Sequence, residues 1–292
     1  MNILTFDIEE WYTRYERFGK DRSKYAVFDH YLDEILDALD QRGFKGTFFC
    51  LGGMADQFPD IVRKIDECGH EIGCHSYGHT WLNKMTREEV LEDTRRAVDA
   101  LEQCIGKKVV SYRAPAFSIG EQNKWAFEVL AECGIERDAS VYPASRDFGG
   151  FPHFGHKTPV IISHGGITLK EFPISTTHLM GKEFAYSGGG YFRFFPLWFV
   201  RQKMRKADYS MTYFHLLDLL TEEFPVMTRE RYEAYFKEPG TLTARYKRYI
   251  KSNLGRKGVF DKLMKLIDTK DFVNIEQADK MINWEEVPIV KI

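Results

Sequence analysis

The chain has 292 residues and a mass of 34.1 kDa, enough for one large domain or two small ones with an ordinary apolar core. Its formal net charge of -2 supplies no basic field for nucleic acid, and no stretch approaches the roughly 20 apolar residues of a membrane-spanning helix. Five cysteines without a Cys-x-x-Cys pair argue against a disulfide framework and a structural zinc knuckle. We therefore expect a soluble protein of a reducing compartment.

Strand-like apolar runs alternate with helical periodicity through the first 133 residues. The run at 3–7 ends in Asp7, and residues 28–39 then space their apolar side chains at helical intervals. Four such strand–helix units predict a parallel sheet covered by helices. The other three predicted pairs are 46–51 with 54–68, 71–75 with 87–104, and 109–113 with 121–133.

The second half of the chain has a less regular pattern. A short strand is expected at 138–141, and the scattered Gly and Pro from 148 to 190 predict a loop-rich insertion. Residues 210–215 read as a late buried strand, and 241–266 as mostly helical and basic. No repeat or linker marks a boundary, so we predict a single domain over 1–292, with a core at about 1–220 and a C-terminal helical extension at about 221–292.

Polar residues follow three of the predicted strands: Asp7 with Glu9 and Glu10, His75 with His79, and Arg113. In a β/α barrel, the carboxyl ends of the strands form the face where active sites are built. Two histidines four residues apart can reach one metal ion, and with one carboxylate they leave positions open for water, as in a hydrolytic site. The alternative is a cap at Asp7 and two unrelated histidines, but joint placement at strand ends favours a site.

The ordered motifs resemble those of the polysaccharide deacetylases of the NodB-homology type, carbohydrate esterase family four. The resemblance spans about residues 1–220, and its sub-patterns Asp-Ile-Glu-Glu-Trp and Gly-Gly-Gly-Tyr-Phe-Arg-Phe-Phe-Pro are similar to those of exopolysaccharide and O-antigen biosynthesis proteins. It implies a distorted (β/α) barrel of about seven strands. The matching motifs are Thr-Phe-Asp at 5–7, His-Ser-x-x-His at 75–79, Arg-x-Pro at 113–115, Asp138 and His215.

The resemblance implies that Asp7 is the general base and that His75 and His79 are metal ligands. Many members carry a second Asp directly after the base, whereas this chain has Ile8. Glu9 is our first candidate for the third ligand, because in an extended segment it shares a face with Asp7; Glu10 is the second.

Further roles follow from the same resemblance. Arg113 would pair with the base and keep it ionised. His215 would be the general acid that protonates the leaving amine, with Asp138 orienting either His215 or the base through a hydrogen bond. The backbone amide near Ala116 would stabilise the oxyanion.

These roles predict a metal-dependent hydrolase that removes an N-acetyl group from a sugar in surface polysaccharide biosynthesis. The expected cofactor is one divalent ion, foremost Zn²⁺, with Co²⁺, Ni²⁺ or Mn²⁺ as substitutes. Two alternatives stay open: hydrolysis of another C–N or ester bond on the same barrel, and a catalytically silent glycan-binding protein.

The expected partners are an N-acetylated sugar, oligosaccharide or lipid-linked sugar, and no nucleic acid. Without an export signal at the N-terminus, a cytoplasmic location is expected. Two features allow alternative interpretations: the aromatic segment 191–199 and a group of basic residues further along the chain. They are either ordinary core and a solvated helix face, or a surface for peripheral contact with an anionic membrane. That basic group comprises Arg245, Lys247, Arg248, Lys251, Arg256 and Lys257.

Overall fold

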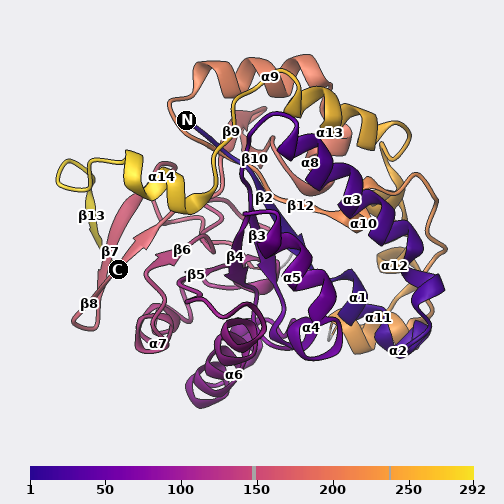
Figure 1. Ribbon diagram of the computed structural model, residues 1–292, viewed down its shortest axis with the longest axis horizontal. Helices are drawn as coiled ribbons and strands as arrows, with labels where there is room; N and C mark the ends of the chain where they lie inside the picture. Colours follow the sequence, from indigo (N-terminus) through magenta and orange to yellow (C-terminus); the bar gives the residue numbers. More distant parts are fainter. Residues whose placement is uncertain (147–148, 237) are drawn as a thin grey trace.

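The computed structural model describes residues 1–146, 149–236 and 238–292. Of the loop-rich stretch expected from 148 to 190, residue 148 lies outside the described residues. Figure 1 shows a central sheet surrounded by helices, with those of residues 52–132 below it and those of residues 189–206 above it in this view.

The central sheet has nine strands, of which seven neighbours in a row are parallel. The last two strands continue from β8 (Ile167–Glu171). β7 (Val160–His164) forms an antiparallel hairpin with β8, and β13 (Ile289–Lys291) pairs with β7 in parallel. The seven parallel strands confirm the expected β/α architecture. In spatial order the strands are β12 (Phe214–His215), β2 (Thr5–Ile8), β3 (Thr47–Cys50), β4 (Glu71–Cys74), β5 (Ser111–Tyr112), β6 (Arg137–Asp138), β8 (Ile167–Glu171), β7 (Val160–His164) and β13 (Ile289–Lys291).

The barrel is distorted where the chain after β8 meets β11 (Ser210–Met211). The Ser175 side chain accepts a hydrogen bond from the Met211 amide at 2.7 Å, and the Tyr209 hydroxyl donates to the Pro173 carbonyl at 2.8 Å. On its other side β11 pairs with β1 (Asn2–Ile3). Side-chain hydrogen bonds therefore connect these two segments in this part of the barrel wall. The central sheet, whose last strand is β12, lies beside them.

The longer helices of the first half follow the predicted apolar periodicity, because each buries one apolar side. The stretch predicted as one helix at 54–68 is divided at Phe58, because Pro59 opens a new helix. These elements are α1 (Glu10–Thr13), α2 (Tyr15–Phe18), η1 (Arg22–Tyr25), α3 (Ala26–Asp40), α4 (Gly52–Gln57), α5 (Pro59–Glu67), η2 (Leu82–Lys84), α6 (Arg87–Ile105), η3 (Pro115–Phe117) and α7 (Ala126–Glu132).

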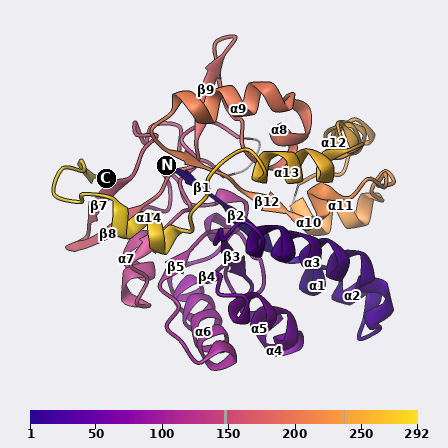
Figure 2. The ribbon, with the colours of Figure 1, turned by 45° about the horizontal axis from the view of Figure 1, so that its top comes forward.

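The second half holds more regular structure than its Gly and Pro content indicated. Two hairpins, β7 with β8 and β9 (Thr176–Leu179) with β10 (Lys182–Ala185), occupy the stretch expected to be loop-rich, and Figure 2 shows the second projecting from the body. The predicted helix at 241–266 is interrupted by Gly255 and Gly258, both at positive φ. The helices are α8 (Gly189–Phe194), α9 (Leu197–Lys206), α10 (Leu216–Leu219), α11 (Arg229–Phe236), α12 (Leu242–Asn253), α13 (Val259–Ile267) and α14 (Ile275–Met281).

Two expectations from composition agree with the structure. All five cysteines are free thiols. Within residues 1–146, 149–236 and 238–292, no helix has both the length and the apolar content needed to cross a bilayer.

Candidate metal centre and active site

The register of the parallel strands brings the predicted site residues to one edge of the sheet. Asp7 pairs directly with His215 between β2 and β12. Glu9 follows β2, His75 follows β4 and Arg113 follows β5. The carboxyl ends of neighbouring parallel strands open on the same face of a barrel, so residues far apart in sequence meet there.

Glu9, His75 and His79 form a cluster whose candidate ligand atoms all lie within 4.8 Å of one another. Nε2 of His79 lies 2.5 Å from Oε2 of Glu9. Nδ1 of His75 lies 2.7 Å from the carbonyl oxygen of Arg113. When Nδ1 carries the proton of that bond, Nε2 keeps its lone pair for a metal. Burial lowers the pKa of His75 to about 4, which favours the neutral imidazole.

The donor set of this cluster fits a divalent metal ion. Burial opposes ionisation of Glu9, but the nearby His79 outweighs it and holds the pKa of the carboxyl well below its usual range. Oε2 of Glu9 is buried, and its near neighbour is Nε2 of His79, itself a candidate ligand atom. Two imidazoles and one such carboxylate oxygen match the ligand types of a hydrolytic zinc site.

Glu10, the second candidate for the third ligand, points elsewhere. Its Oε1 accepts a hydrogen bond from the amide of Leu217 at 2.7 Å, which ties the start of α1 to the turn after His215. Burial, together with the charge of Glu9, raises the pKa of Glu10 to about 7. Of the two glutamates that the sequence left open, the structure therefore groups Glu9 with the histidines.

Asp7 is held from both sides. Oδ1 accepts a 2.7 Å hydrogen bond from the fully buried Arg113, and Oδ2 lies 3.6 Å from Nε2 of His215. Arg113 also donates to Thr5 Oγ1 at 2.7 Å and to the Ala139 carbonyl at 3.2 Å, so its guanidinium is fixed. Burial would raise the pKa of Asp7, but Arg113, His75 and His215 lower it below its ordinary value. The carboxylate is thus ionised and oriented, as a general base requires.

His215 is oriented by a carboxylate that sequence reasoning missed. Its Nδ1 lies 3.0 Å from Oδ2 of Asp218, whose Oδ1 accepts a 2.6 Å bond from the buried Arg193. Burial disfavours the charged imidazole, but the bond to Asp218 and the charges of Glu9, Asp218 and Asp7 raise the pKa of His215 to about 10. His215 therefore carries a proton at neutral pH, as a general acid must.

Asp138 differs from its predicted role. Its Oδ1 accepts a 2.5 Å bond from Ser140, whose Oγ in turn accepts from the amide of Ala114 at 2.8 Å. Its carboxyl also pairs with the buried carboxyl of Glu171, and the carboxylate that contacts His215 is Asp218. Burial raises the pKa of Asp138. Asp138 thus supports the turn that carries Arg113 rather than His215 itself.

The backbone around the site is strained. Ala116, the predicted oxyanion donor, lines the cleft within η3 at a φ of 55°, and Phe117 beside it has a φ of 53°. Ser76 and His79 also have positive φ. Non-glycine residues in this conformation cost of order 1–3 kcal/mol and cluster at functional sites.

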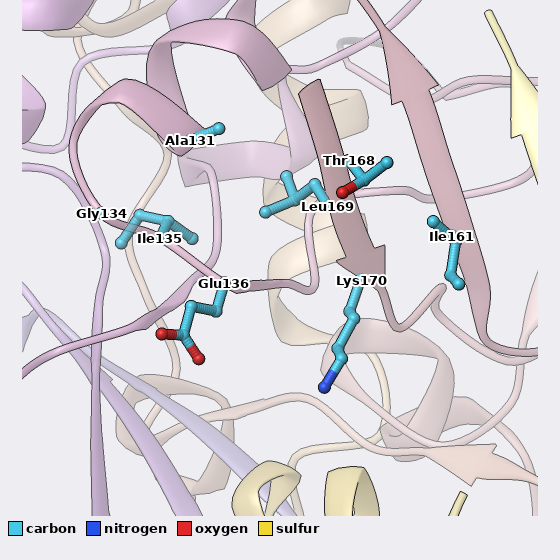
Figure 3. A pocket seen from close by; sticks show the side chains of 8 residues that line it. All are labelled: Ala131, Gly134, Ile135, Glu136, Ile161, Thr168, Leu169 and Lys170. Carbon is cyan, nitrogen blue, oxygen red and sulfur yellow. The ribbon is translucent and has the colours of Figure 1, made fainter. Parts of the chain in front are cut away.

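These residues share a cleft of about 200 Å³. Its lining includes Asp7, Glu9, His79 and His215, with aromatic walls from Trp81, Tyr213 and Tyr235. A second hollow of about 490 Å³ lies between α7 and the β7–β8 hairpin, where Glu136 and Lys170 are the charged lining residues (Figure 3). That hollow contains none of the site residues, so the chemistry belongs to the smaller cleft.

Comparison with known proteins divides the chain into two matched segments. Residues 3–137 match the family model described as polysaccharide deacetylase, the region that contributes Asp7, Glu9, both histidines and Arg113. The first half of the chain is therefore similar to the polysaccharide deacetylases. Residues 139–280 match a domain of unknown function (DUF3473), which contributes His215, Asp218 and Arg193. His215 and the residues that support it therefore come from a different matched segment than Asp7, Glu9 and the two histidines.

Proteins similar to this chain include two enzymes of bacterial peptidoglycan. Peptidoglycan-N-acetylglucosamine deacetylase of Bacillus cereus is 40% identical over 96 residues, covering 32% of this chain and 35% of that protein. Peptidoglycan-N-acetylmuramic acid deacetylase PdaA of Bacillus subtilis is 26% identical over 113 residues, covering 37% and 43%. The chain thus spans less than half the length of these curated relatives. A crystal structure from Mycobacterium smegmatis, assigned to the polysaccharide deacetylases, aligns with 98% of this chain and 91% of its own chain. The TM-score is 0.63 and the sequence identity 18%, which shows that the two proteins share a fold.

Proposed function

We propose that this polysaccharide deacetylase homologue is a metal-dependent hydrolase that removes the acetyl group from an N-acetylated sugar. The observation that carries the proposal is the arrangement of Asp7 between Arg113 and His215, beside the Glu9–His75–His79 cluster in one cleft. An ionised base, a protonated acid and a fitting ligand set are what amide hydrolysis requires.

The residues divide the reaction between them. Asp7 takes a proton from the attacking water, whose oxygen bonds to the acetyl carbon. His215 gives its proton to the sugar nitrogen as the C–N bond breaks, so acetate and a free amine leave. Ala116 lines the cleft, and its backbone amide would stabilise the carbonyl oxygen as this becomes negative. A divalent ion held by Glu9, His75 and His79 would polarise that carbonyl and acidify the water.

The cleft walls support a sugar as the substrate. Trp81, Tyr213 and Tyr235 offer flat, amphipathic surfaces beside the charged centre, and such rings pack against the apolar faces of sugars while their polar atoms bond hydroxyls. We propose a biosynthetic intermediate of a surface polysaccharide, either nucleotide-linked or lipid-linked, as this substrate. Zinc as the ion and a cytoplasmic location likewise stay predictions.

A substrate panel tests this function. Zinc-loaded protein is incubated with N-acetylated nucleotide sugars, lipid-linked sugars and oligosaccharides, and acetate and free amine are both quantified. Equimolar acetate and amine from at least one member supports deacetylation. Acetate without amine would indicate an O-acetyl esterase, and binding of a member without any turnover would favour the catalytically silent alternative.

A further inference from the structure

Helix α12 carries a stripe of exposed apolar side chains. No residue of this helix is buried. Leu242, Tyr246 and Ile250, followed by Leu254, are each between 51% and 61% exposed. Residues four apart lie on the same side of a helix, so they form one row. Arg248, on the opposite side of α12, lines the active-site cleft, and the row therefore faces away from the body of the protein.

A second exposed apolar group adjoins this row. Phe194 and Trp198, at the junction of α8 and α9, are 62% and 66% exposed. Arg193, next to Phe194, donates a 2.9 Å hydrogen bond to the carbonyl of Lys251 in α12. A Cβ built on Gly255, next to Leu254, would lie 2.6 Å from the Arg193 carbonyl oxygen. Figures 1 and 2 both show α8 and α12 on the same side of the molecule.

In the two chain segments that carry these groups the charged side chains are basic, although the hydroxyl of Tyr249 in α12 donates to Glu223 Oε2 from outside them at 3.4 Å. The sequence contains no Asp or Glu from 184 to 207 or from 239 to 260, although the whole chain has a net charge of -2. Of the basic residues expected to contact a membrane, Arg256 is buried and bonds the Leu217 and Leu220 carbonyls, and Arg245 bonds the Gly240 and Met227 carbonyls. The basic residues that are exposed in and around α12 are Lys247, Lys251 and Lys257.

We propose that this surface, which we call the basic apolar face, binds the surface of a lipid bilayer with anionic headgroups. It comprises Phe194, Trp198, Leu242, Tyr246, Ile250, Leu254 and the three exposed lysines. Aromatic and aliphatic side chains flanked by lysine suit the boundary between headgroups and acyl chains. A second copy is a poorer occupant, because a two-fold contact through this face would bring lysines against lysines.

The face also lies close to the active site. Arg248 reaches the cleft from the inner side of α12 while Tyr246 and Ile250 point outward, so about one helix diameter, roughly 10 Å, separates the two surfaces. A bilayer bound on the outer side would place the cleft beside the headgroup layer. The binding itself requires no turnover and is independent of the deacetylase proposal.

Sedimentation of the full chain with vesicles tests the inference. We expect binding to vesicles of equal parts phosphatidylcholine and phosphatidylglycerol at low salt, weaker binding at high salt, and little binding to phosphatidylcholine alone. Combined Lys247→Gln, Lys251→Gln and Lys257→Gln should lower the partition coefficient on the order of a hundredfold. Tyr246→Ser with Ile250→Ser should lower it roughly tenfold or more.

Matched variants elsewhere serve as controls. Lys84→Gln, Lys280→Gln and Lys291→Gln remove the same charge from other exposed positions, and Met281→Ser with Ile289→Ser remove comparably exposed apolar groups. These variants should bind like the wild type. The inference would be overturned by equal losses in both sets of variants, or by no binding of the wild type at low salt. It would also be overturned if light scattering showed a dimer that the Tyr246→Ser, Ile250→Ser variant abolishes, while the protein did not bind vesicles. Acetate release from a water-soluble substrate, measured in parallel, reports the proposed function separately.

Discussion

Nδ1 of His215 lies 3.0 Å from Oδ2 of Asp218, three residues further along the same chain. The acid and its orienting carboxylate thus come from one strand-to-helix turn, between β12 and α10. Arg193 fixes the other oxygen of Asp218 at 2.6 Å and is itself held by the Lys251 carbonyl. The protonated state of His215 consequently depends on this turn and on α8.

Replacing Asp218 by Asn should change the pH dependence of turnover. The reaction needs His215 protonated, and activity is lost as pH rises through its pKa, which Asp218 helps to raise to about 10. Removing that negative charge lowers the pKa of His215, so the alkaline limb of the kcat profile should move to lower pH, with kcat at pH 8 reduced about tenfold or more. Asp138→Asn is the matched control and should leave the alkaline limb in place.

Asp7→Asn should abolish turnover while leaving the fold and metal content largely unchanged, because the change removes the base but little volume. A loss of order 10²-fold or more is expected for a general base. Steady-state rates, circular dichroism and metal analysis measure the three properties. A near wild-type rate would move the role of base to another carboxylate of the cleft.

Glu9→Gln should lose metal and Glu10→Gln should retain it. The carboxylate of Glu9 lies among the ligand atoms of His75 and His79, whereas Glu10 bonds the Leu217 amide. We expect affinity for Zn²⁺, measured by calorimetry, to fall on the order of a hundredfold in Glu9→Gln. The reverse ranking of the two variants would show that the ligand assignment is wrong.

His70 should make the fold sensitive to mild acid. It is buried against Phe48 and accepts a hydrogen bond from the Gly46 amide. Burial lowers its pKa from 6.5 to about 4, so the unfolded chain binds a proton first as pH falls. Stability present above pH 6.5 should be lost progressively down to pH 4, by up to about 3 kcal/mol.

Urea unfolding of the wild type and His70→Asn at pH 7, 6, 5 and 4 checks the effect of His70. The free energy of unfolding of the wild type should fall more steeply than that of the variant over this range. Parallel pH dependences in the two proteins would assign the acid sensitivity to other groups.

Much of the first half of the fold could be predicted from sequence, because its strand–helix units repeat with clear apolar periodicity. The boundaries failed where one residue overrides periodicity, as at Pro59 and at Gly258. The hairpins between 160 and 185 were missed because short antiparallel strands with Gly-rich turns resemble loops in composition. β13 was missed because it pairs with β7, more than a hundred residues away, and long-range pairing leaves no local signal.

The candidate site likewise has one part that could be predicted from sequence and one part that could not. Asp7, His75, His79 and Arg113 stand at strand ends, where spacing alone places them on one face. On resemblance, Asp138 was expected to orient either His215 or the base, whereas the spacing of His215 and Asp218, three residues apart at a turn, was a local signal for the observed contact. The pairing of Arg193 with Asp218 depends on how α8 packs against the barrel, which no spacing in the sequence encodes.

The most direct test of the account is acetate and amine release by one preparation of the protein, metal-stripped and then given one equivalent of Zn²⁺, with an N-acetylated sugar as substrate. Stripped protein should release neither product, and equimolar acetate and free amine should appear after zinc is restored. Release at the same rate without metal, or none from any N-acetylated sugar by the zinc-loaded protein, would contradict it.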